Sequence, residues 1–486
     1  MNEDIKKLQP SVLWKYFGEI LEIPRPSKKE EKIIEYLVDF AKKNNLDYET
    51  DKTKNVLIRK PATLGHKDKK VVALQSHMDM VCEKNNDTQH DFDNDPIQAY
   101  VEEGWVKAKG TTLGGDDGIG VAAQLAILAS NEIEHGPIEC LFTVDEESGL
   151  TGAFGLKPGF LKADILLNLD SEDEGELFIG CAGGIDTLIE LPFEKAATPK
   201  AHKTYKLNIK GLNGGHSGDD INKGLANANK ILARLLFETN KEFNICLSSF
   251  DAGNLRNAIA REGNAVVMVP EGNANTFEAY VSKFNTTLQN EYRVTEKNLE
   301  VSFESTNTPE FILSDDSQRN FVNSIYACPH GVIEMAMNMD NFVQTSTNLA
   351  AVKTKEDHFY ITTSQRSSVE SQKYMIADRV AATFQLVGAK TSHGDGYPGW
   401  TPNPQSEIKD IVAESYNKLF KTPAVVKAIH AGLECGLIGD KYPKMDMISY
   451  GPTIRGAHSP AEKLNIESSQ HFWDLTIEVL KNIPNK

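Results

Sequence analysis

The fold of this chain is decided by one stretch, Val71-Val72-Ala73-Leu74-Gln75-Ser76-His77-Met78-Asp79. Its apolar run is rich in β-branched residues and has no helical spacing, which predicts a buried strand. Residues i and i+2 of an extended chain point to the same side, so His77 and Asp79 are expected on one face where the strand ends. There the carboxylate accepts the imidazole N–H and prepares the ring for a metal. A lone H-x-D pair is more often incidental, so its weight depends on the rest of the chain.

Two further predicted strands end in acidic groups. Residues 138–144 run into Asp145-Glu146-Glu147, and residues 164–169 end at Asp170. In open α/β sheets ligands bind outside the carboxyl ends of the strands. Three such ends at one edge of a sheet indicate a site.

A glycine-rich segment lies between the first two of these strands, Thr112-Leu113-Gly114-Gly115-Asp116-Asp117-Gly118-Ile119-Gly120. A glycine-rich turn before a helix is one form of phosphate site. Here two carboxylates would repel a phosphate, and no P-loop lysine follows, so a cation is the better ligand. The alternative is a plain turn whose aspartate caps the helix.

Composition restricts the possible partners and compartment. The formal net charge of the 486 residues is −17, which argues against nucleic acid and anionic membranes as partners. We find no run of about 18 apolar residues and no signal-peptide pattern, so no membrane span is expected. The six cysteines are scattered, which is typical of reduced thiols in a cytoplasmic protein. Cys82 lies near His77 but is expected to be a buried thiol, not a ligand.

The length favours two domains. The stretch 180–184 contains three glycines and is expected to be a hinge or linker, and residues 397–400 mark a return to the first pattern. We therefore predict an α/β protein with a mainly parallel central sheet in residues 1–184 and 398–486. An α+β domain of strands and helices is expected to interrupt it at residues 185–397.

The candidate ligands are more than one metal ion needs. The five side chains at strand ends or in loops are His77, Asp116, Glu147, Asp170 and His458. This number suits two ions about 3.5–4 Å apart with one bridging carboxylate. Glu146 and Glu147 are neighbours whose side chains diverge, so one can bind metal while the other takes a proton from water. Asp145 is expected to be a surface or turn residue.

The order of these motifs resembles the M20 family of metallopeptidases. The motifs are H-M-D, L-G-G-D-D-G-I-G, D-E-E-S-G-L-T-G, N-L-D-S-E and G-A-H-S-P, and segments 212–218 and 430–436 also match. Within the family, the sequence is most similar to the aminoacyl-histidine (Xaa-His) dipeptidase branch. The resemblance covers essentially the whole chain and rests on the ordered set of motifs.

The resemblance implies a dinuclear-metal peptidase, interrupted by a lid or dimerisation domain, that hydrolyses unblocked dipeptides of many sequences. Asp116 would bridge two divalent ions, usually Zn²⁺, with Co²⁺ or Mn²⁺ as alternatives. His77 and Asp170 would complete one site, and Glu147 and His458 the other.

Further roles follow from the same resemblance. Asp79 would orient His77, and Glu146 would be the general base and acid. Asp117 stands where related sequences often have Asn, and it is expected to support the turn.

Three substrate contacts are expected on the same grounds, with plainer alternatives beside them. His216 would stabilise the oxyanion, although a structural loop histidine fits the same sequence. Arg366 would clamp the terminal carboxylate, the alternative being a surface salt bridge. Glu434 would receive the free α-amino group; without the resemblance it is a turn residue. The family also implies a homodimer, so His216 or Arg366 would act in either subunit's site.

Other functions stay open at this point. The same metal core is suited to an N-acyl amino acid deacylase or a tripeptidase. A catalytically inactive scaffold would need no stoichiometric metal. A nucleotide-binding protein fits poorly because the glycine-rich loop is acidic.

Overall fold

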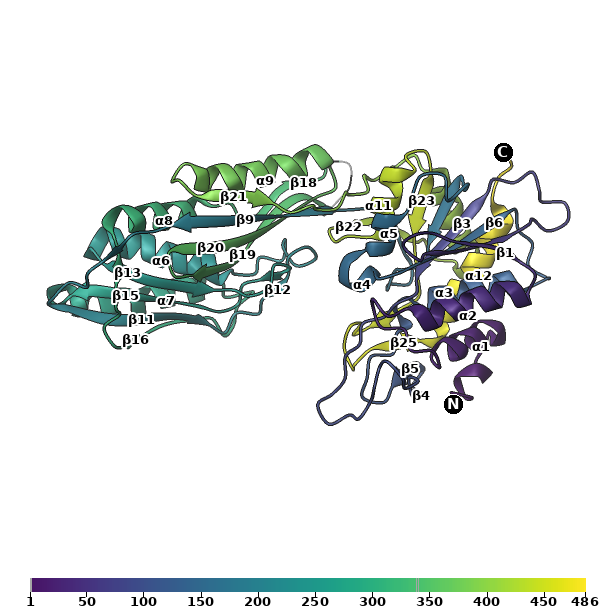
Figure 1. The fold of residues 1–486 in the computed structure, drawn as a ribbon, viewed down its shortest axis with the longest axis horizontal. Coiled ribbons are helices and arrows are strands. Elements are labelled where there is room, and N and C mark those ends of the chain that lie inside the picture. The colour runs from purple at the N-terminus through teal and green to yellow at the C-terminus, as the bar shows by residue number, and fades with distance from the viewer. Residues whose placement is uncertain (1, 338, 340) are drawn as a thin grey trace. The chain divides into compact units, whose positions relative to one another are not determined.

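The computed structural model describes residues 2–337, 339 and 341–486, which form two compact units. Unit 1 comprises Met1–Cys181, Trp400–Ala428 and Leu433–Lys486, and unit 2 comprises Ala182–Gly399 and Ile429–Gly432. Figure 1 shows the elements of each unit. The sequence-based division placed residues 429–432 with the flanking segments, whereas here they cluster with unit 2. The lid or dimerisation role of residues 185–397 stays a prediction.

Unit 1 is built on a mixed sheet with the strand order β1-β2-β6-β3-β7-β23-β8-β22. Its four central strands run parallel, and β1, β2 and β8 pair antiparallel at the flanks. The bounds are β1 Asp47–Thr50, β2 Val56–Lys60, β3 Val72–His77, β6 Ile138–Thr143, β7 Ile165–Asn168, β8 Glu176–Cys181, β22 Val425–Ile429 and β23 Asp446–Ser449. Every residue of β3, β6 and β7 is buried, as expected for parallel strands covered on both faces.

Helices pack around this sheet. They are α1 Ser11–Ile20, α2 Glu31–Lys43, α3 Gly115–Ala129, α4 Glu146–Gly149, α5 Thr151–Gly155, α10 Glu407–Phe420, α11 Glu434–Lys441 and α12 Ile466–Asn482, with a short 3-10 helix at Ile5–Lys7. Almost every residue of α3 is buried, so this helix lies in the core and is apolar on all sides. A small separate sheet joins β4 Ala99–Glu102, β5 Trp105–Ala108, β24 Ile454–Arg455 and β25 Lys463–Asn465.

Unit 2 contains a second, antiparallel sheet with the order β16-β11-β15-β13-β19-β20-β9-β21, and β18 pairs with β19. The bounds are β9 Gly183–Pro192, β11 His202–Lys210, β13 Cys246–Ala252, β15 Gly263–Pro270, β16 Glu300–Ser305, β18 Gly331–Met335, β19 Val343–Thr354, β20 His358–Ser367 and β21 Lys390–His393. Two pairs of short strands lie off this sheet: β10 Lys195–Ala196 with β17 Ile312–Leu313, and β12 Gly215–His216 with β14 Ala258–Ile259. The helices are α6 Ala228–Phe243, α7 Ala274–Glu291, α8 Asp315–Ala327 and α9 Glu370–Gln385, plus a 3-10 turn at Glu271–Asn273.

The structure confirms the α/β class. The stretch 180–184 contains the boundary between the two units, and β8 and β9 run into it from both sides with only Ala182 between them. A side chain at Gly183 would place its Cβ 2.4 Å from the backbone nitrogen of Gly399. The glycine is therefore needed for close approach of two backbones, not for flexibility.

Within the described residues, no helix combines the length and apolar character needed to cross a bilayer.

Candidate metal centre

The candidate ligands of unit 1 meet because parallel strands end at one edge of its sheet. His77 is the last residue of β3 and lies in register with Thr143 at the end of β6. Glu146 and Glu147 begin α4 just after β6, and Asp170 follows β7 by two residues. Asp116 comes from the first turn of α3, and His458 from the loop between β24 and β25.

Two groups of ligand atoms form there and share Asp116. One group contains His77, Asp116 and Asp170, and the other contains Asp116, Glu147 and His458, with the ligand atoms of each group within 4.8 Å of one another. Oδ1 of Asp116 lies 3.1 Å from His77 Nε2, and Oδ2 lies 3.2 Å from His458 Nε2. One carboxylate thus presents a separate oxygen to each group, as a bridge between two cations requires.

The donor chemistry of the two groups fits divalent cations. Each group offers imidazole nitrogen and carboxylate oxygen, a set that Zn²⁺, Co²⁺ and Mn²⁺ accept. Glu147 Oε1 is buried and has no hydrogen-bond partner among the residues that the structure describes. Leaving such a carboxylate oxygen without a partner is costly, and a cation removes that cost.

The ionisation of the site shows the same need for positive charge. Burial alone would lower the pKa of His77, but Asp170, Asp116 and Asp79 together raise that pKa well above its ordinary value. Hydrogen bonds to Asp116 and Glu147 raise the pKa of His458 to about 11. The carboxylates around the two rings thus favour positive charge at this place, as a cation-binding site does.

The pKa values of two carboxyl groups of the site are raised, whereas the pKa of Asp116 is lowered. Burial raises the pKa of Glu146 well above its ordinary value, and the nearby charge of Asp170 adds to the shift. Burial likewise raises the pKa of Asp170. For Asp116 burial acts in the same direction, but hydrogen bonds from His458 and His77 outweigh it and lower the pKa. Environments that separate the pKa values of neighbouring acids are typical of acid–base sites.

Asp79 is fully buried and contacts two parts of the site. Its Oδ1 lies 3.4 Å from Nδ1 of His77 and accepts the backbone N–H of Glu146 at 3.0 Å. Its Oδ2 accepts the hydroxyl of Ser27 at 2.8 Å and the N–H of Glu147 at 3.3 Å. Asp79 therefore holds the segment that carries Glu146 and Glu147, and it lies beside the ring of His77, whose Nδ1 has no hydrogen-bond partner within the described residues.

Asp117 and Asp145 differ from the ligands in what they bind. Asp117, joined to Asp116 by a cis peptide bond, accepts the N–H of Gly120 at 3.1 Å and so supports the turn into α3. Asp145 is not the surface residue that one interpretation of the sequence allowed, because only 4% of it is exposed. It has a left-handed backbone, with φ of 50°, and accepts the hydroxyls of Ser148 and Thr151.

Two buried residues that the sequence analysis missed hold the ligand-bearing loops. The guanidinium of Arg25 donates to the carbonyls of Met78, Asp79 and Gly114. A Cβ at Gly114 would lie 2.6 Å from Arg25 Nη2, which explains the glycine there. The carboxylate of Glu462 accepts the N–H groups of the turn that precedes Asp116. No local periodicity or spacing in the sequence marks either residue, because each acts on a segment far away along the chain.

Glu434 lies at the start of α11 and is fully buried in unit 1. Its Oε2 accepts Gln75 Nε2 and Thr143 Oγ1, both at 2.6 Å. Its Oε1 is buried without a hydrogen-bond partner in the part of the chain that the structure describes. Burial raises the pKa of Glu434 to about 7.

The other two predicted substrate contacts lie in unit 2 and close to each other. Arg366 is in β20 and only 7% exposed, so the surface salt bridge considered from the sequence is ruled out. Its Nη1 donates to the hydroxyl of Tyr397 at 3.2 Å, and its Nη2 lies 3.5 Å from both His216 Nε2 and Ser217 Oγ. The His216 ring is partly exposed, and its Nδ1 accepts the N–H of Asp219.

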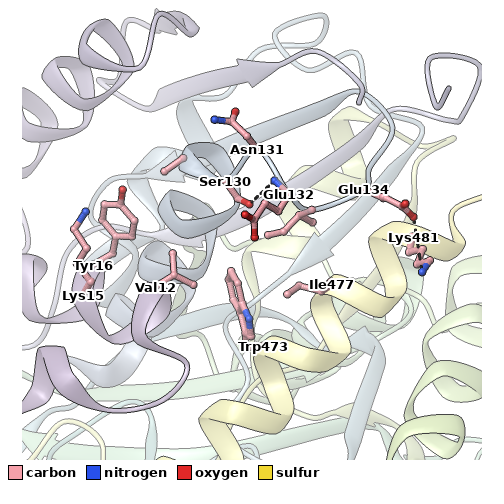
Figure 2. A pocket seen from close by; sticks show the side chains of 12 residues that line it. Val12, Lys15, Tyr16, Ser130, Asn131, Glu132, Glu134, Trp473, Ile477 and Lys481 are labelled. Atoms are coloured by element: carbon pink, nitrogen blue, oxygen red, sulfur yellow. Dashed lines mark hydrogen bonds and ion pairs between the residues drawn. The ribbon is translucent and has the colours of Figure 1, made fainter. Parts of the chain in front are cut away.

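A separate groove of about 760 Å³ lies in unit 1 (Figure 2). Its walls come from α1, the loop after α3, and α12, and include Tyr16, Ser130, Trp473 and Lys481. None of the ten candidate site residues lines it, so the groove is not part of the metal centre.

The sequence and the fold of this chain are similar to those of known peptidases. The model of peptidase family M20/M25/M40 matches residues 73–482. A curated Escherichia coli (strain K12) protein, the "Cytosol non-specific dipeptidase", is 45% identical over 483 residues, which are 99% of this chain and 100% of that protein. The crystal structure of an aminoacylhistidine dipeptidase from Vibrio alginolyticus aligns with a TM-score of 0.92 and 44% identity, covering 99% of this chain and 98% of the other. An aminopeptidase PepT structure from Bacillus cereus, with a TM-score of 0.63 and 16% identity over 98% of this chain and 99% of the other, shares the fold.

Proposed function

Since the chain belongs to peptidase family M20/M25/M40, we propose that it is a metal-dependent dipeptidase of broad specificity. Its substrates are unblocked dipeptides, Xaa-His dipeptides among them. The observation that carries this proposal is the sharing of Asp116 by two ligand groups with Glu146 beside them. The similarity over nearly the whole chain to a protein named as a dipeptidase supports the substrate class.

His77, Asp116 and Asp170 hold one divalent cation, and Asp116, Glu147 and His458 hold the other. We assign Zn²⁺ to both positions, with Co²⁺ and Mn²⁺ as ions the same donors accept. When bound, the two cations polarise the scissile carbonyl and the attacking water.

Glu146 is the proton carrier of the reaction. Its carboxylate lies within 4.8 Å of the ligand atoms of His77 and Glu147. It takes a proton from the attacking water and delivers it to the nitrogen of the leaving amino acid. Asp79 keeps this geometry by holding both His77 and the backbone of Glu146.

Substrate recognition uses groups that match the two ends of a dipeptide. Glu434 Oε1, buried and without a partner within the described structure, accepts the α-ammonium group. Arg366 binds the terminal carboxylate, and His216 donates to the oxyanion, in the same subunit or in the partner of a homodimer. In Arg366→Ala the preference for a free dipeptide over its C-terminal amide should shrink.

The experiment that tests the function is a hydrolysis panel with the purified protein. It contains free dipeptides, including Xaa-His, together with their N-acetyl derivatives and matching tripeptides. The proposal expects turnover of the free dipeptides alone. Faster cleavage of the N-acetyl compounds would identify a deacylase, and faster cleavage of tripeptides a tripeptidase. We place the enzyme in the cytoplasm, in agreement with the name of the Escherichia coli relative.

A further inference from the structure

The turn that leads into Asp116 points four backbone N–H groups at one side chain, that of Glu462. Oε2 accepts the N–H of Leu113 at 2.7 Å and that of Gly114 at 3.0 Å. Oε1 accepts the N–H of Gly115 at 2.7 Å, and the N–H of Asp116 lies 3.4 Å away. Glu462 is only 3% exposed.

Such a turn is a natural binding place for an anion. Successive N–H groups around a glycine in the left-handed region, here Gly114 with φ of 70°, form a concave nest at the start of a helix. This is the feature that makes glycine-rich loops bind phosphate. In this chain the nest is already filled, because Glu462 supplies its carboxylate from within the protein.

Glu462 also belongs to the loop that carries His458, four residues earlier. His458 has a left-handed backbone, with φ of 62°, which is unfavourable for a residue with a side chain and needs support from its surroundings. The loop supplies that support as a tight turn, in which the N–H of Glu462 donates to the carbonyl of Ser459 at 3.0 Å. The Ser459 hydroxyl donates to the carbonyl of Gly456 at 2.7 Å. One short segment thus links His458 to the turn before Asp116.

We propose that Glu462 is a positioning residue that sets the spacing between Asp116 and His458 and thereby the affinity of the cation they share. The inference rests on the proposed two-metal centre. The group of Asp116, Glu147 and His458 depends on Glu462 for two of its three ligands. The group of His77, Asp116 and Asp170 depends on it for one. Loss of the hydrogen bonds to Glu462 is therefore expected to weaken binding of the first cation more than binding of the second.

Glu462→Gln is the most informative variant, because both carboxylate oxygens of Glu462 accept hydrogen bonds. Each carboxylate oxygen accepts from two N–H groups, and glutamine replaces one oxygen by an NH₂ donor. In either orientation, two backbone N–H groups then face a donor. Glu462→Asp keeps both oxygens and the charge but shortens the side chain by one methylene, so it is expected to retain part of the function. Glu467→Gln, an exposed position five residues on, is the matched control for loss of one charge.

The test is calorimetric titration of metal-free protein with Zn²⁺, combined with a thermal melt of each variant. His458→Ala identifies which of the two binding steps belongs to the cation shared with Asp116. In Glu462→Gln that step is expected to weaken by about 10- to 100-fold, with a smaller loss in the other step. Glu462→Asp should lie between wild type and Glu462→Gln, and Glu467→Gln should bind like wild type.

Each contrary outcome has a distinct meaning. Wild-type affinity in a folded Glu462→Gln, or a larger loss at the cation held with His77, overturns the proposal. If Glu462→Gln does not fold, wild-type affinity in Glu462→Asp overturns it, and a weakened His458-dependent step in that variant supports it. If the wild-type protein itself binds no Zn²⁺, the two-metal function fails, and the role of Glu462 falls with it.

Discussion

Asp79 Oδ1 accepts the backbone N–H of Glu146 at 3.0 Å and lies 3.4 Å from Nδ1 of His77, so one carboxylate contacts both the proposed metal ligand and the proposed proton carrier. The candidate ligand His77 and the candidate proton carrier Glu146 thus both lie against Asp79 at the ends of β3 and β6. Mutation can separate the two proposed roles, because Asp79 contacts the backbone of Glu146, whereas the proton would be carried by its side chain.

Replacement of Glu146 by Gln removes the proton carrier and keeps its size and its N–H bond to Asp79. Metal content should stay at the wild-type level, while kcat falls by about 10²- to 10⁴-fold, the usual contribution of a general acid–base group. The measurement pairs metal analysis with steady-state kinetics on one dipeptide. Turnover close to wild type at full metal content would rule out Glu146 as the proton carrier.

Asp116 and its neighbour Asp117 are predicted to behave differently. Asp116→Ala removes an oxygen from both ligand groups, so Zn²⁺ affinity should fall in both binding steps. Asp117→Asn keeps the oxygen that accepts the N–H of Gly120, and it should leave metal content and activity largely intact. Calorimetric titration of the two variants checks both statements. Loss of one cation with the other still tightly bound in Asp116→Ala would show a terminal ligand instead of a bridge.

Metal binding should release protons. The pKa of His458 is raised to about 11, so its ring is protonated at neutral pH in the metal-free protein, and the pKa of His77 is raised as well. Cations must displace these protons, so affinity rises with pH and falls on acidification. Titrations at one pH in buffers of different ionisation heat should show that protons are released as the two sites fill. Heats that are the same in every buffer would contradict this.

Glu434 is predicted to select for a free amino terminus. Glu434→Gln keeps the shape but removes the charge that the α-ammonium group meets, so KM for a free dipeptide should rise by at least about 10-fold. Activity on the N-acetyl derivative, which has no ammonium group, should change little. The ratio of kcat/KM for the two substrates in wild type and variant measures the effect. An unchanged ratio would show that Glu434 does not bind the α-ammonium group and has a structural role only.

The candidate ligands named from the sequence do come together in the structure, and they could be found because their signals are local. Apolar runs that end at His77, Glu146 and Asp170 mark strand ends, and parallel strands bring such ends together. Glu462 and Arg25 carried no such signal, since each contacts backbone groups that are distant in the chain. The same limit applies at Gly183, because no local signal shows that this glycine lies against the backbone of Gly399.

The central claim is tested most directly by reconstitution. Metal-free protein is titrated with Zn²⁺ while hydrolysis of an Xaa-His dipeptide is followed, with Glu146→Gln titrated in parallel. Activity should rise from zero and reach its plateau at about two equivalents, and Glu146→Gln should take up the same amount of Zn²⁺ while staying nearly inactive. Hydrolysis that survives complete removal of metal, or a plateau at one equivalent, would contradict a two-metal dipeptidase.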